Sequence, residues 1–206
     1  MSDASPRLVA FDLDDTLAPS KSAIDPRIGD LLLALADKVE VAIISGGQLQ
    51  QFRSQVVERL PQASPELLAH FHLMPTCGTQ YYLLTPAGVE TVYAHSLTDD
   101  EKQRALTAVR EEAERLGLWE ADPWGDILED RGSQITFSAL GQKAPRDAKH
   151  DWDPTGAKRE ALRAAVAPRL PGLEVRSGGS TSIDITLSGI DKAYGMARLV
   201  EQTGIP

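Results

Sequence analysis

Apolar and polar residues follow two different periods along the first 60 residues. Apolar runs at 8–11 and 41–44 have the length and composition of strands that are buried on both faces. Apolar residues spaced three and four apart across 26–36 predict an amphipathic helix with Asp25 as its N-cap. A second helix is expected from about 48–60. This β-α-β-α order predicts an α/β fold with a doubly wound parallel sheet.

The pattern changes near residue 97, where strands and helices follow each other in a different order. Thr98 and Glu101 have the spacing of a capping box at the start of a helix. The expected elements are a strand at 73–76, a hairpin through 80–84 and 89–93, a helix from 98 to 117, strands at 134–140, 173–176 and 182–187, a hairpin turn at 178–179, a mobile polar loop at 144–153 and a helix starting at Asp153. We therefore predict an inserted α+β cap at 95–188, with a core formed by 1–94 and 189–206.

The strands of the inserted segment separate apolar from polar side chains. Residues 183, 185 and 187 are apolar and share one face, whereas Ser182, Asp184 and Thr186 share the other. The strand that begins at 134 shows the same alternation. We expect the apolar face to be covered by helices and the polar face to meet solvent or a ligand.

Composition limits the classes of partner. The chain has 206 residues, a net charge of −9 and a pI near 4.9, which argues against nucleic-acid and anionic-membrane partners but not against a small anionic substrate. A single cysteine, Cys77, fits a reducing compartment. Residues 1–7 lack a leader pattern, and the chain has no apolar run of about 20 residues. We expect a cytoplasmic protein that is not bound to membranes.

Three aspartates follow the first predicted strand. Asp12, Asp14 and Asp15 come directly after residues 8–11, and the carboxyl ends of strands are where ligands bind in open α/β sheets. Two carboxylates ~4 Å apart repel by roughly 4 kcal/mol at an effective dielectric near 20. A cation would relieve this repulsion, and Mg²⁺ prefers oxygen ligands. The alternative is an acidic turn without a ligand.

Two further positions suggest phosphate chemistry. Ser45 and Gly46 lie between a predicted strand and a helix, where a hydroxyl and backbone N–H groups can hold phosphate oxygens. Lys192 is expected in the first helical turn after Asp191, where the helix dipole disfavours a cation by roughly 0.3–1 kcal/mol. A bound anion would reverse that penalty. The alternatives are an ordinary N-cap serine and a solvated lysine.

Several segments resemble the haloacid dehalogenase (HAD) superfamily of phosphotransferases. L-V-A-F-D-L-D-D-T-L at 8–17 resembles its motif I, V-A-I-I-S-G-G at 41–47 its motif II, and I-D-K-A-Y-G-M at 190–196 its motif III. Three more segments resemble the phosphomannomutase-like branch of this superfamily, which has an α/β cap. They are P-T-C-G-T-Q-Y at 75–81, D-R-G-S-Q-I-T-F-S-A-L-G at 130–141 and G-G-S-T-S-I-D-I-T at 178–186.

The resemblance implies a Rossmann-like core, an aspartyl-phosphate intermediate and a role for each matching residue. Asp12 would be the nucleophile, and Asp14 the general acid and base. Lys192 would pair with the nucleophile and the phosphate, which Ser45 and Gly46 would also bind. Mg²⁺ would be held by the Asp12 carboxylate and the Asp14 backbone carbonyl. The implied substrate contacts in the cap are Arg131, Gln142, Ser182 and Asp184.

The sequence departs from the family in two places. Gln142 stands where the mutases carry an arginine for a second phosphate, and no acidic motif IV occurs before Pro206. We therefore expect a Mg²⁺-dependent phosphatase acting on a small phosphorylated sugar. The alternatives are a phosphomannomutase, and an inactive sugar-phosphate-binding module or truncated fragment. The missing motif predicts an incomplete chain with weak Mg²⁺ binding and little activity. A homodimer remains an open alternative to a monomer.

Overall fold

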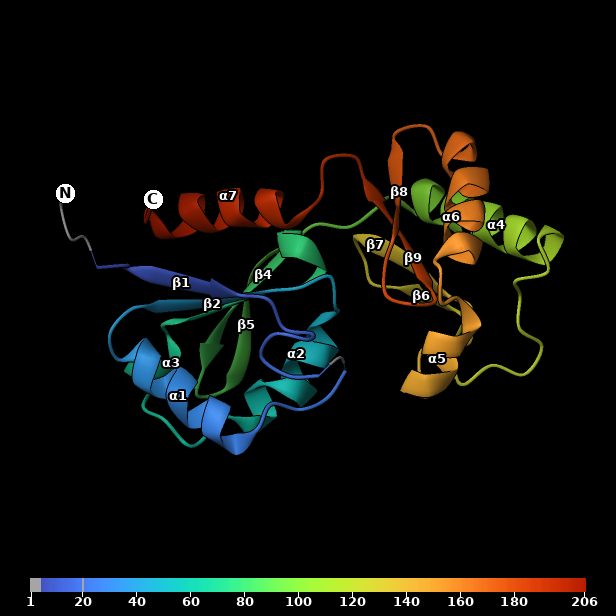
Figure 1. Ribbon diagram of the computed structural model, residues 1–206. Helices are drawn as coiled ribbons and strands as arrows, with labels where there is room; N and C mark the ends of the chain where they lie inside the picture. The colour runs from blue at the N-terminus through green and yellow to red at the C-terminus, as the bar shows by residue number, and fades with distance from the viewer. Residues whose placement is uncertain (1–4, 20) are drawn as a thin grey trace. The chain divides into compact units, whose positions relative to one another are not determined.

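The computed structural model describes residues 5–19 and 21–206 (Figure 1). The chain forms two compact units, one running to His95 and resuming at Ile190, the other running from Ser96 to Gly189. Most of the segment in which we predicted no leader, residues 1–4, lies outside the described residues. No helix in the described ranges is both long enough and apolar enough to span a bilayer.

The first unit is built on a five-stranded sheet in the order β1-β2-β3-β4-β5. Strands β1, β2 and β3 are parallel, and β4 and β5 pair antiparallel beyond them. The strands are β1 Leu8–Phe11, β2 Glu40–Ile44, β3 Phe71–Met74, β4 Gln80–Thr85 and β5 Gly88–Ala94. The helices are α1 Pro26–Ala36, α2 Leu49–Gln55, α3 Pro65–Leu68 and α7 Lys192–Thr203, with 3₁₀ turns at Val57–Arg59 and Thr76–Gly78.

Helices pack on both faces of this sheet (Figure 1). One face packs against α1 and α2 in a buried cluster that includes Leu32, Ile43 and Phe52. The other face packs against α7 in a cluster that includes Ile44 and Leu199. Because the first three strands are parallel and both faces are covered, the predicted α/β fold with a Rossmann-like core is confirmed.

Strand β1 is less buried than its sequence predicts. Its four residues were expected to be buried on both faces, but Ala10 is exposed and the other three are only half-buried. Among the described strands β1 pairs only with β2, so it forms an edge of the sheet. An edge strand has one neighbour instead of two, which explains its partial exposure.

The helix predicted at 48–60 is interrupted. Helix α2 ends at Gln55, because Val56 has φ −121° and ψ −63° and does not continue the helical backbone. The following 3₁₀ turn, Val57–Arg59, completes the connection. The break brings the Gln55 carbonyl within reach of the Ile24 N–H, which donates to it at 2.9 Å.

The second unit contains a four-stranded antiparallel sheet in the order β6-β7-β9-β8. Its strands are β6 Leu128–Asp130, β7 Gln134–Ser138, β8 Leu173–Ser177 and β9 Ser182–Leu187. Its helices are α4 Asp99–Arg115, α5 Arg146–Trp152 and α6 Ala157–Val166, with a 3₁₀ turn at Ala167–Arg169. The unit is inserted between β5 and α7.

Helices α4 and α6 cover the apolar face of this sheet. The buried cluster between them includes Val109, Phe137, Leu162 and Ile185. The predicted capping box is present, since the Thr98 side chain accepts from Glu101 N and the Glu101 carboxylate accepts from Thr98 N. The predicted covering of one sheet face by helices is therefore observed.

Two predictions in this unit are wrong. The segment 144–153 was expected to be a loop, but most of it forms α5, whose Trp152 packs against the buried cluster. The helix expected from Asp153 begins at Ala157, after Gly156 with φ 77°. Asp153 still caps this helix from a distance, because its carboxylate accepts from Lys158 N and Arg159 N, each at 3.1 Å.

Candidate active site

Strand β1 delivers Asp12 to a tightly bonded acidic loop. One carboxylate oxygen of Asp12 accepts from Leu13 N at 2.8 Å, and the Leu13 side chain is fully buried. Asp14 accepts from Lys21 N at 2.8 Å, and Asp15 N donates to the Ala18 carbonyl at 2.7 Å. Asp15 has φ 57°, a left-handed conformation that aspartate tolerates better than most residues. The loop therefore fixes the aspartates through backbone bonds.

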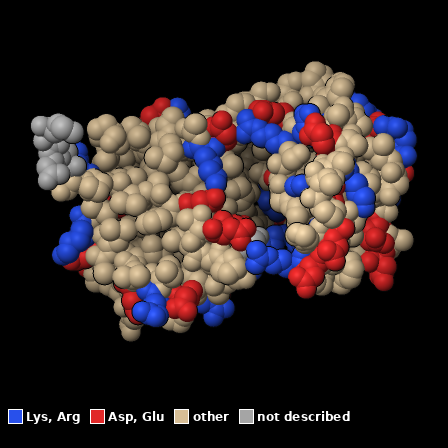
Figure 2. Space-filling model, in the orientation of Figure 1, with Lys and Arg blue, Asp and Glu red and all other residues tan. Residues whose placement is uncertain are grey.

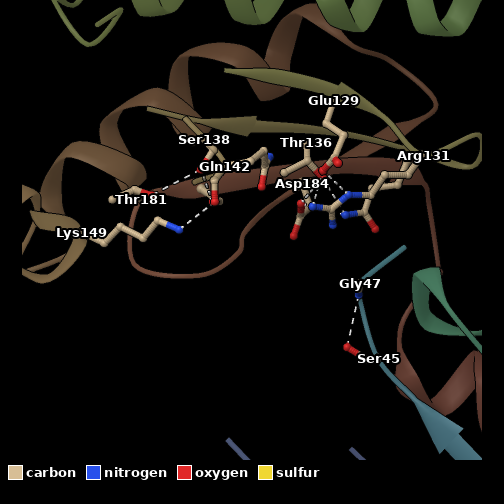
Figure 3. A network of polar contacts seen from close by, with 12 residues as sticks. Ser45, Gly47, Glu129, Arg131, Thr136, Ser138, Gln142, Lys149, Thr181 and Asp184 are labelled. Carbon is tan, nitrogen blue, oxygen red and sulfur yellow. Dashed lines mark hydrogen bonds and ion pairs between the residues drawn. The ribbon is translucent and has the colours of Figure 1, made fainter. Parts of the chain in front are cut away.

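Strand β2 ends at Ile44 and is followed by Ser45, whose side chain is buried. The Ser45 hydroxyl accepts from Gly47 N at 3.2 Å, as Figure 3 shows, and a hydroxyl in this role can still donate its own hydrogen. Helix α2 begins at Leu49, directly beyond the 45–47 loop. A hydroxyl and backbone N–H groups therefore lie between the end of a strand and the start of a helix.

Helix α7 brings Lys192 to the acidic loop. Asp191 is the N-cap of α7 and accepts from Tyr194 N at 2.8 Å, as predicted. The Lys192 ammonium forms an ion pair and hydrogen bond with the second carboxylate oxygen of Asp12. The cation at this unfavourable helix end thus has an anionic partner, 180 residues away in sequence.

A left-handed turn, Thr76–Gly78, lies between the 45–47 loop and α7. Its three residues have φ of 48°, 55° and 82°, and two of them are not glycine, at a cost of roughly 1–2 kcal/mol each. Thr76 N donates to the Gly47 carbonyl and Cys77 N to the Ser45 carbonyl, both at 2.9 Å. These bonds hold the turn against the loop that follows β2.

The polar face of the second unit forms an extended hydrogen-bond network (Figure 3). Gln134 and Thr136 both donate to the same Asp184 oxygen, at 2.8 and 2.7 Å. Ser138 lies 3.3 Å from the Ser182 hydroxyl, oxygen to oxygen. Gln134, Thr136 and Ser138 were expected on an open face but are buried, because β7 is a central strand whose polar side chains bond across to β9.

Arg131 and Gln142 lie at the ends of this network. The Arg131 guanidinium binds one Glu129 carboxylate oxygen through two nitrogens, at 2.6 and 2.8 Å, and its side chain is 8% exposed. The backbone carbonyl oxygen of Gln142 accepts from the Lys149 ammonium at 3.2 Å (Figure 3). Asp184 lies opposite Thr136, which lies opposite Glu129, so these three share the polar face.

The structure thus brings some of the predicted residues together within each unit. Asp12 contacts Lys192 in the first unit, and Ser45 and Gly46 belong to the neighbouring loop after β2. In the second unit Ser182 and Asp184 lie on one face of β9. The predicted apolar partner at position 187 is 40% exposed, because it is the last residue of β9.

The comparisons with known proteins agree in sequence and in fold. Phosphomannomutase 1 of Mus musculus is 24% identical over 207 residues, which cover 95% of this chain and 74% of the relative. Phosphomannomutase of Saccharomyces cerevisiae is 24% identical over 194 residues, covering 91% of this chain and 72% of the relative. A comparison with family models finds no match.

Two solved structures share the fold across nearly the whole chain. A haloacid dehalogenase-like hydrolase from Bacteroides thetaiotaomicron superposes with a TM-score of 0.62 at 16% identity, covering 98% of this chain and 78% of its own. IMP-bound IMP-nucleotidase of Plasmodium falciparum superposes with a TM-score of 0.65 at 13% identity, covering 97% of this chain. This chain spans just over half, 56%, of that nucleotidase chain.

The chain is thus similar in sequence to phosphomannomutases and in fold to a haloacid dehalogenase-like hydrolase. The relatives and structural neighbours named above are enzymes. The acidic loop, Ser45 and Lys192 could be proposed from the sequence because each follows a recognisable strand or begins a helix.

Other residues of the candidate site were not predicted from the sequence. Glu129 and Lys149 contact predicted residues but have no motif of their own, and the left-handed turn contains only one glycine, Gly78, as a signal. Gly195 was quoted within a motif but given no role. Glu129 and Lys149 lie two and seven residues from the residues they contact, but neither spacing is a recognised motif. The contacts of the turn with the 45–47 loop and with Gly195 join segments far apart in the chain, which a single sequence does not reveal.

The oxygen atoms of the acidic loop fit a Mg²⁺ site that has few protein ligands. Mg²⁺ is often bound through one or two carboxylates together with substrate phosphate and water. The Asp12 carboxylate and the Asp14 backbone carbonyl are oxygen donors of this kind. No cluster of three metal-binding side chains occurs among residues 5–19 and 21–206. The fit therefore depends on oxygen atoms from substrate and solvent.

Proposed function

We propose that this protein is a Mg²⁺-dependent phosphatase of the HAD type, which hydrolyses a small phosphorylated sugar through an aspartyl-phosphate on Asp12. The contact between the Lys192 ammonium and the Asp12 carboxylate carries the proposal. A lysine in this position orients the carboxylate and supplies positive charge for a phosphoryl group that approaches it. Phosphoryl transfer is catalysed mainly by such positioning and charge neutralisation.

The proposed reaction has two displacements. In the first, an Asp12 oxygen bonds to phosphorus while the ester oxygen leaves and takes a proton from Asp14. In the second, Asp14 removes a proton from water, which attacks phosphorus and releases Asp12 and inorganic phosphate. Ser45 and the N–H of Gly46 would hold phosphate oxygens, and Mg²⁺ would neutralise charge on the phosphoryl group.

The polar face of the second unit supports a sugar as the substrate. Asp184, Ser182 and Gln142 offer carboxylate, hydroxyl and amide groups, which suit the hydroxyls of a sugar. We propose Asp184, Ser182, Gln142 and Arg131 as the residues that determine specificity. The charge of Arg131 is offset by Glu129, so this face is better suited to a neutral sugar hydroxyl than to a second phosphate.

Phosphomannomutase is the second candidate, favoured by the sequence likeness to phosphomannomutases of mouse and yeast. A mutase returns the phosphoryl group to the sugar and must hold a bisphosphate. Gln142 and the Arg131–Glu129 pair argue for the phosphatase. The third candidate, a sugar-phosphate-binding module without activity, would leave the Lys192–Asp12 contact without a catalytic purpose.

A substrate panel distinguishes these candidates. The purified chain is assayed with Mg²⁺ and hexose phosphates, pentose phosphates, nucleotides and phosphotyrosine peptides, and free phosphate is measured. We expect the sugar phosphates to be hydrolysed fastest. A preference for phosphotyrosine peptides would contradict the proposal, and conversion of mannose 1-phosphate to mannose 6-phosphate without phosphate release would establish the mutase. Binding of sugar phosphate without turnover would favour the third candidate.

Removing the charge of Glu129 tests its influence on Arg131. In Glu129→Gln the arginine keeps a hydrogen-bond partner but loses the opposing charge, so KM for a hexose bisphosphate should fall relative to KM for the monophosphate. Glu160→Gln is the matched control, because it removes a carboxylate paired with Arg163 on the surface of α6. Equal KM ratios in both variants would remove Glu129 from the specificity argument.

We propose a small phosphorylated sugar as the binding partner and the cytoplasm as the location of this protein. Lys and Arg side chains are interspersed with Asp and Glu on the face shown in Figure 2, and the net charge is −9, which does not favour nucleic acid.

A further inference from the structure

Helix α7 contacts the left-handed turn, Thr76–Gly78, backbone to backbone. A Cβ added to Gly195 would lie 2.8 Å from the Cys77 carbonyl oxygen, and a Cβ added to Gly78 would lie 2.5 Å from the Gly195 Cα. Real Cβ atoms do not approach other atoms so closely. Both positions therefore require glycine if α7 is to keep its distance from the turn.

Gly195 lies one helical turn after Lys192, so this contact fixes the end of α7 that carries the ammonium. On its other side the turn is bonded to the carbonyls of Ser45 and Gly47. The Tyr93 hydroxyl donates to the Gly78 carbonyl at 2.8 Å, and the Thr76 and Thr79 hydroxyls lie 2.6 Å apart, oxygen to oxygen. The turn is held from three directions.

We propose that Gly195 and the left-handed turn are positioning elements that set the distance between the 45–47 loop and Lys192. The strained turn acts as a rigid spacer, with the loop on one side and α7 on the other. Strained backbone of this kind persists where surrounding structure over-determines it, and it concentrates at functional sites. The inference rests on the proposed phosphatase function for its kinetic test, but not for its chemical test.

The kinetic test is a double-mutant cycle with p-nitrophenyl phosphate as the probe. Gly195→Ala should lower kcat by 10- to 100-fold, because a displacement of about 1 Å near reacting groups has effects of this size. In a Lys192→Ala background the same substitution should cause little further loss, since its effect is transmitted through Lys192. The control is Met196→Ala, the next residue on α7, whose side chain is 38% exposed.

Two kinetic outcomes would overturn the proposal. One is a Gly195→Ala protein with kcat within twofold of wild type. The other is an equal loss in both backgrounds, which would indicate a general structural role. If Gly195→Ala does not fold, Tyr93→Phe replaces it in the cycle, because it removes only the hydroxyl that bonds Gly78.

The chemical test needs no enzymatic activity. Cys77 is the only cysteine in the chain and lies in the left-handed turn, so its alkylation by iodoacetamide reports on that turn. Gly195→Ala and Tyr93→Phe should be alkylated several times faster than wild type, and Met196→Ala at the wild-type rate. Wild-type rates in both variants would overturn the positioning role even if phosphatase activity is found. An inactive wild type with accelerated alkylation in the variants would contradict the proposed function alone.

Discussion

The two oxygens of the Asp12 carboxylate have different partners. One accepts from the backbone of Leu13, and the other faces the Lys192 ammonium. The first partner fixes the orientation of the side chain and the second supplies charge. An amide at this position could keep the backbone bond but could not act as a nucleophile.

We therefore predict that Asp12→Asn abolishes phosphatase turnover and leaves the fold intact. Asp14→Asn should lower kcat by ~10²–10⁴, the usual effect of removing a general acid or base. Both are measured with an aryl phosphate, with circular dichroism to verify folding. Asp15→Asn is the control, because asparagine tolerates the left-handed φ of 57° and we assign Asp15 no catalytic role. Retained activity in folded Asp12→Asn would exclude the covalent mechanism.

A second polar cluster lies outside the candidate site, on the side of the sheet that faces α7. The two carboxylate oxygens of Glu40 contact one ring nitrogen each of His70 and His72, both at 3.0 Å. The other ring nitrogen of His72 lies 2.6 Å from the Tyr81 hydroxyl oxygen. Burial holds the pKa of His72 below its usual value near 6.5, although Glu40 opposes the shift. Burial also raises the pKa of Tyr81 to about 12.

These shifts predict how stability depends on pH. Below about pH 6.5 the unfolded chain binds a proton on His72 that the folded protein resists, so the free energy of unfolding should fall as pH falls from 7 toward 5. His72→Gln cannot titrate and should flatten that dependence, with Glu40 and His70 still present. Urea denaturation of both proteins at pH 7.5 and 5.5 measures the difference. An equal decline in the two proteins would exclude His72 as its cause.

Among the secondary-structure elements, α6 depends on an unusual cap. Asp153 lies four residues before Ala157, and its carboxylate binds Lys158 N, Arg159 N and the Arg159 guanidinium. Arg159 also donates to the Gly179 carbonyl at 2.7 Å, in the turn between β8 and β9. One buried carboxylate thus joins the start of a helix to a hairpin turn.

Replacing Asp153 with alanine should be strongly destabilising. It leaves two backbone N–H groups without their acceptor and removes the carboxylate that neutralises the partly buried Arg159 guanidinium, at a cost of about 3 kcal/mol in the free energy of unfolding. Urea denaturation at pH 7 measures this cost. Asp151→Ala is the control, because the Asp151 side chain is 82% exposed and its loss should change stability by less than about 0.5 kcal/mol. Similar stabilities for the two variants would contradict the capping role.

The accuracy of the sequence analysis depended on whether an element is specified locally. Helix α1 and the capping box of α4 were predicted because Asp25, Thr98 and Glu101 act on backbone only a few residues away. Helix α5 was missed because its polar sequence becomes helical through Trp152, which packs against distant residues. The gap between Asp153 and the helix it caps has no established sequence signature.

The candidate site shows the same division. Asp12, Ser45 and Lys192 could be predicted as site residues because motifs mark the ends of strands and helices. The left-handed turn could not, because threonine and cysteine seldom adopt positive φ, and the contacts that stabilise the turn come from the distant 45–47 loop, Tyr93 and Gly195. The same holds for Glu129, whose importance depends on the arginine that it pairs with.

At the scale of the whole molecule, the two units have separate hydrophobic cores. The cluster around Phe137 draws only on residues between Ser96 and Gly189, and the clusters on the two faces of the five-stranded sheet draw only on the other unit. Each unit has its own sheet and its own covering helices. We expect each to respond separately to loss of core packing.

A large cavity in the second unit should therefore leave the first unit intact. Phe137→Ala removes a ring that is 1% exposed and should lower the stability of that unit by about 3–5 kcal/mol. Hydrogen exchange read by mass spectrometry should speed up in peptides from 96–189 and remain unchanged in β2 and β3. Acceleration of exchange in both units would show that they unfold together.

The separation of Asp12 from Lys192 by 180 residues has a consequence for how the protein is made. At a synthesis rate of about 5–20 residues per second, Lys192 follows Asp12 from the ribosome by roughly 10–40 s. Until α7 arrives, the sheet face that contains Ile44, Met74 and Tyr81 has no helix to cover it. Contacts so distant in sequence also form slowly once the chain is released. The nascent chain thus exposes an apolar sheet face throughout the synthesis of the inserted unit. We expect aggregation and chaperone binding to occur mainly in this interval.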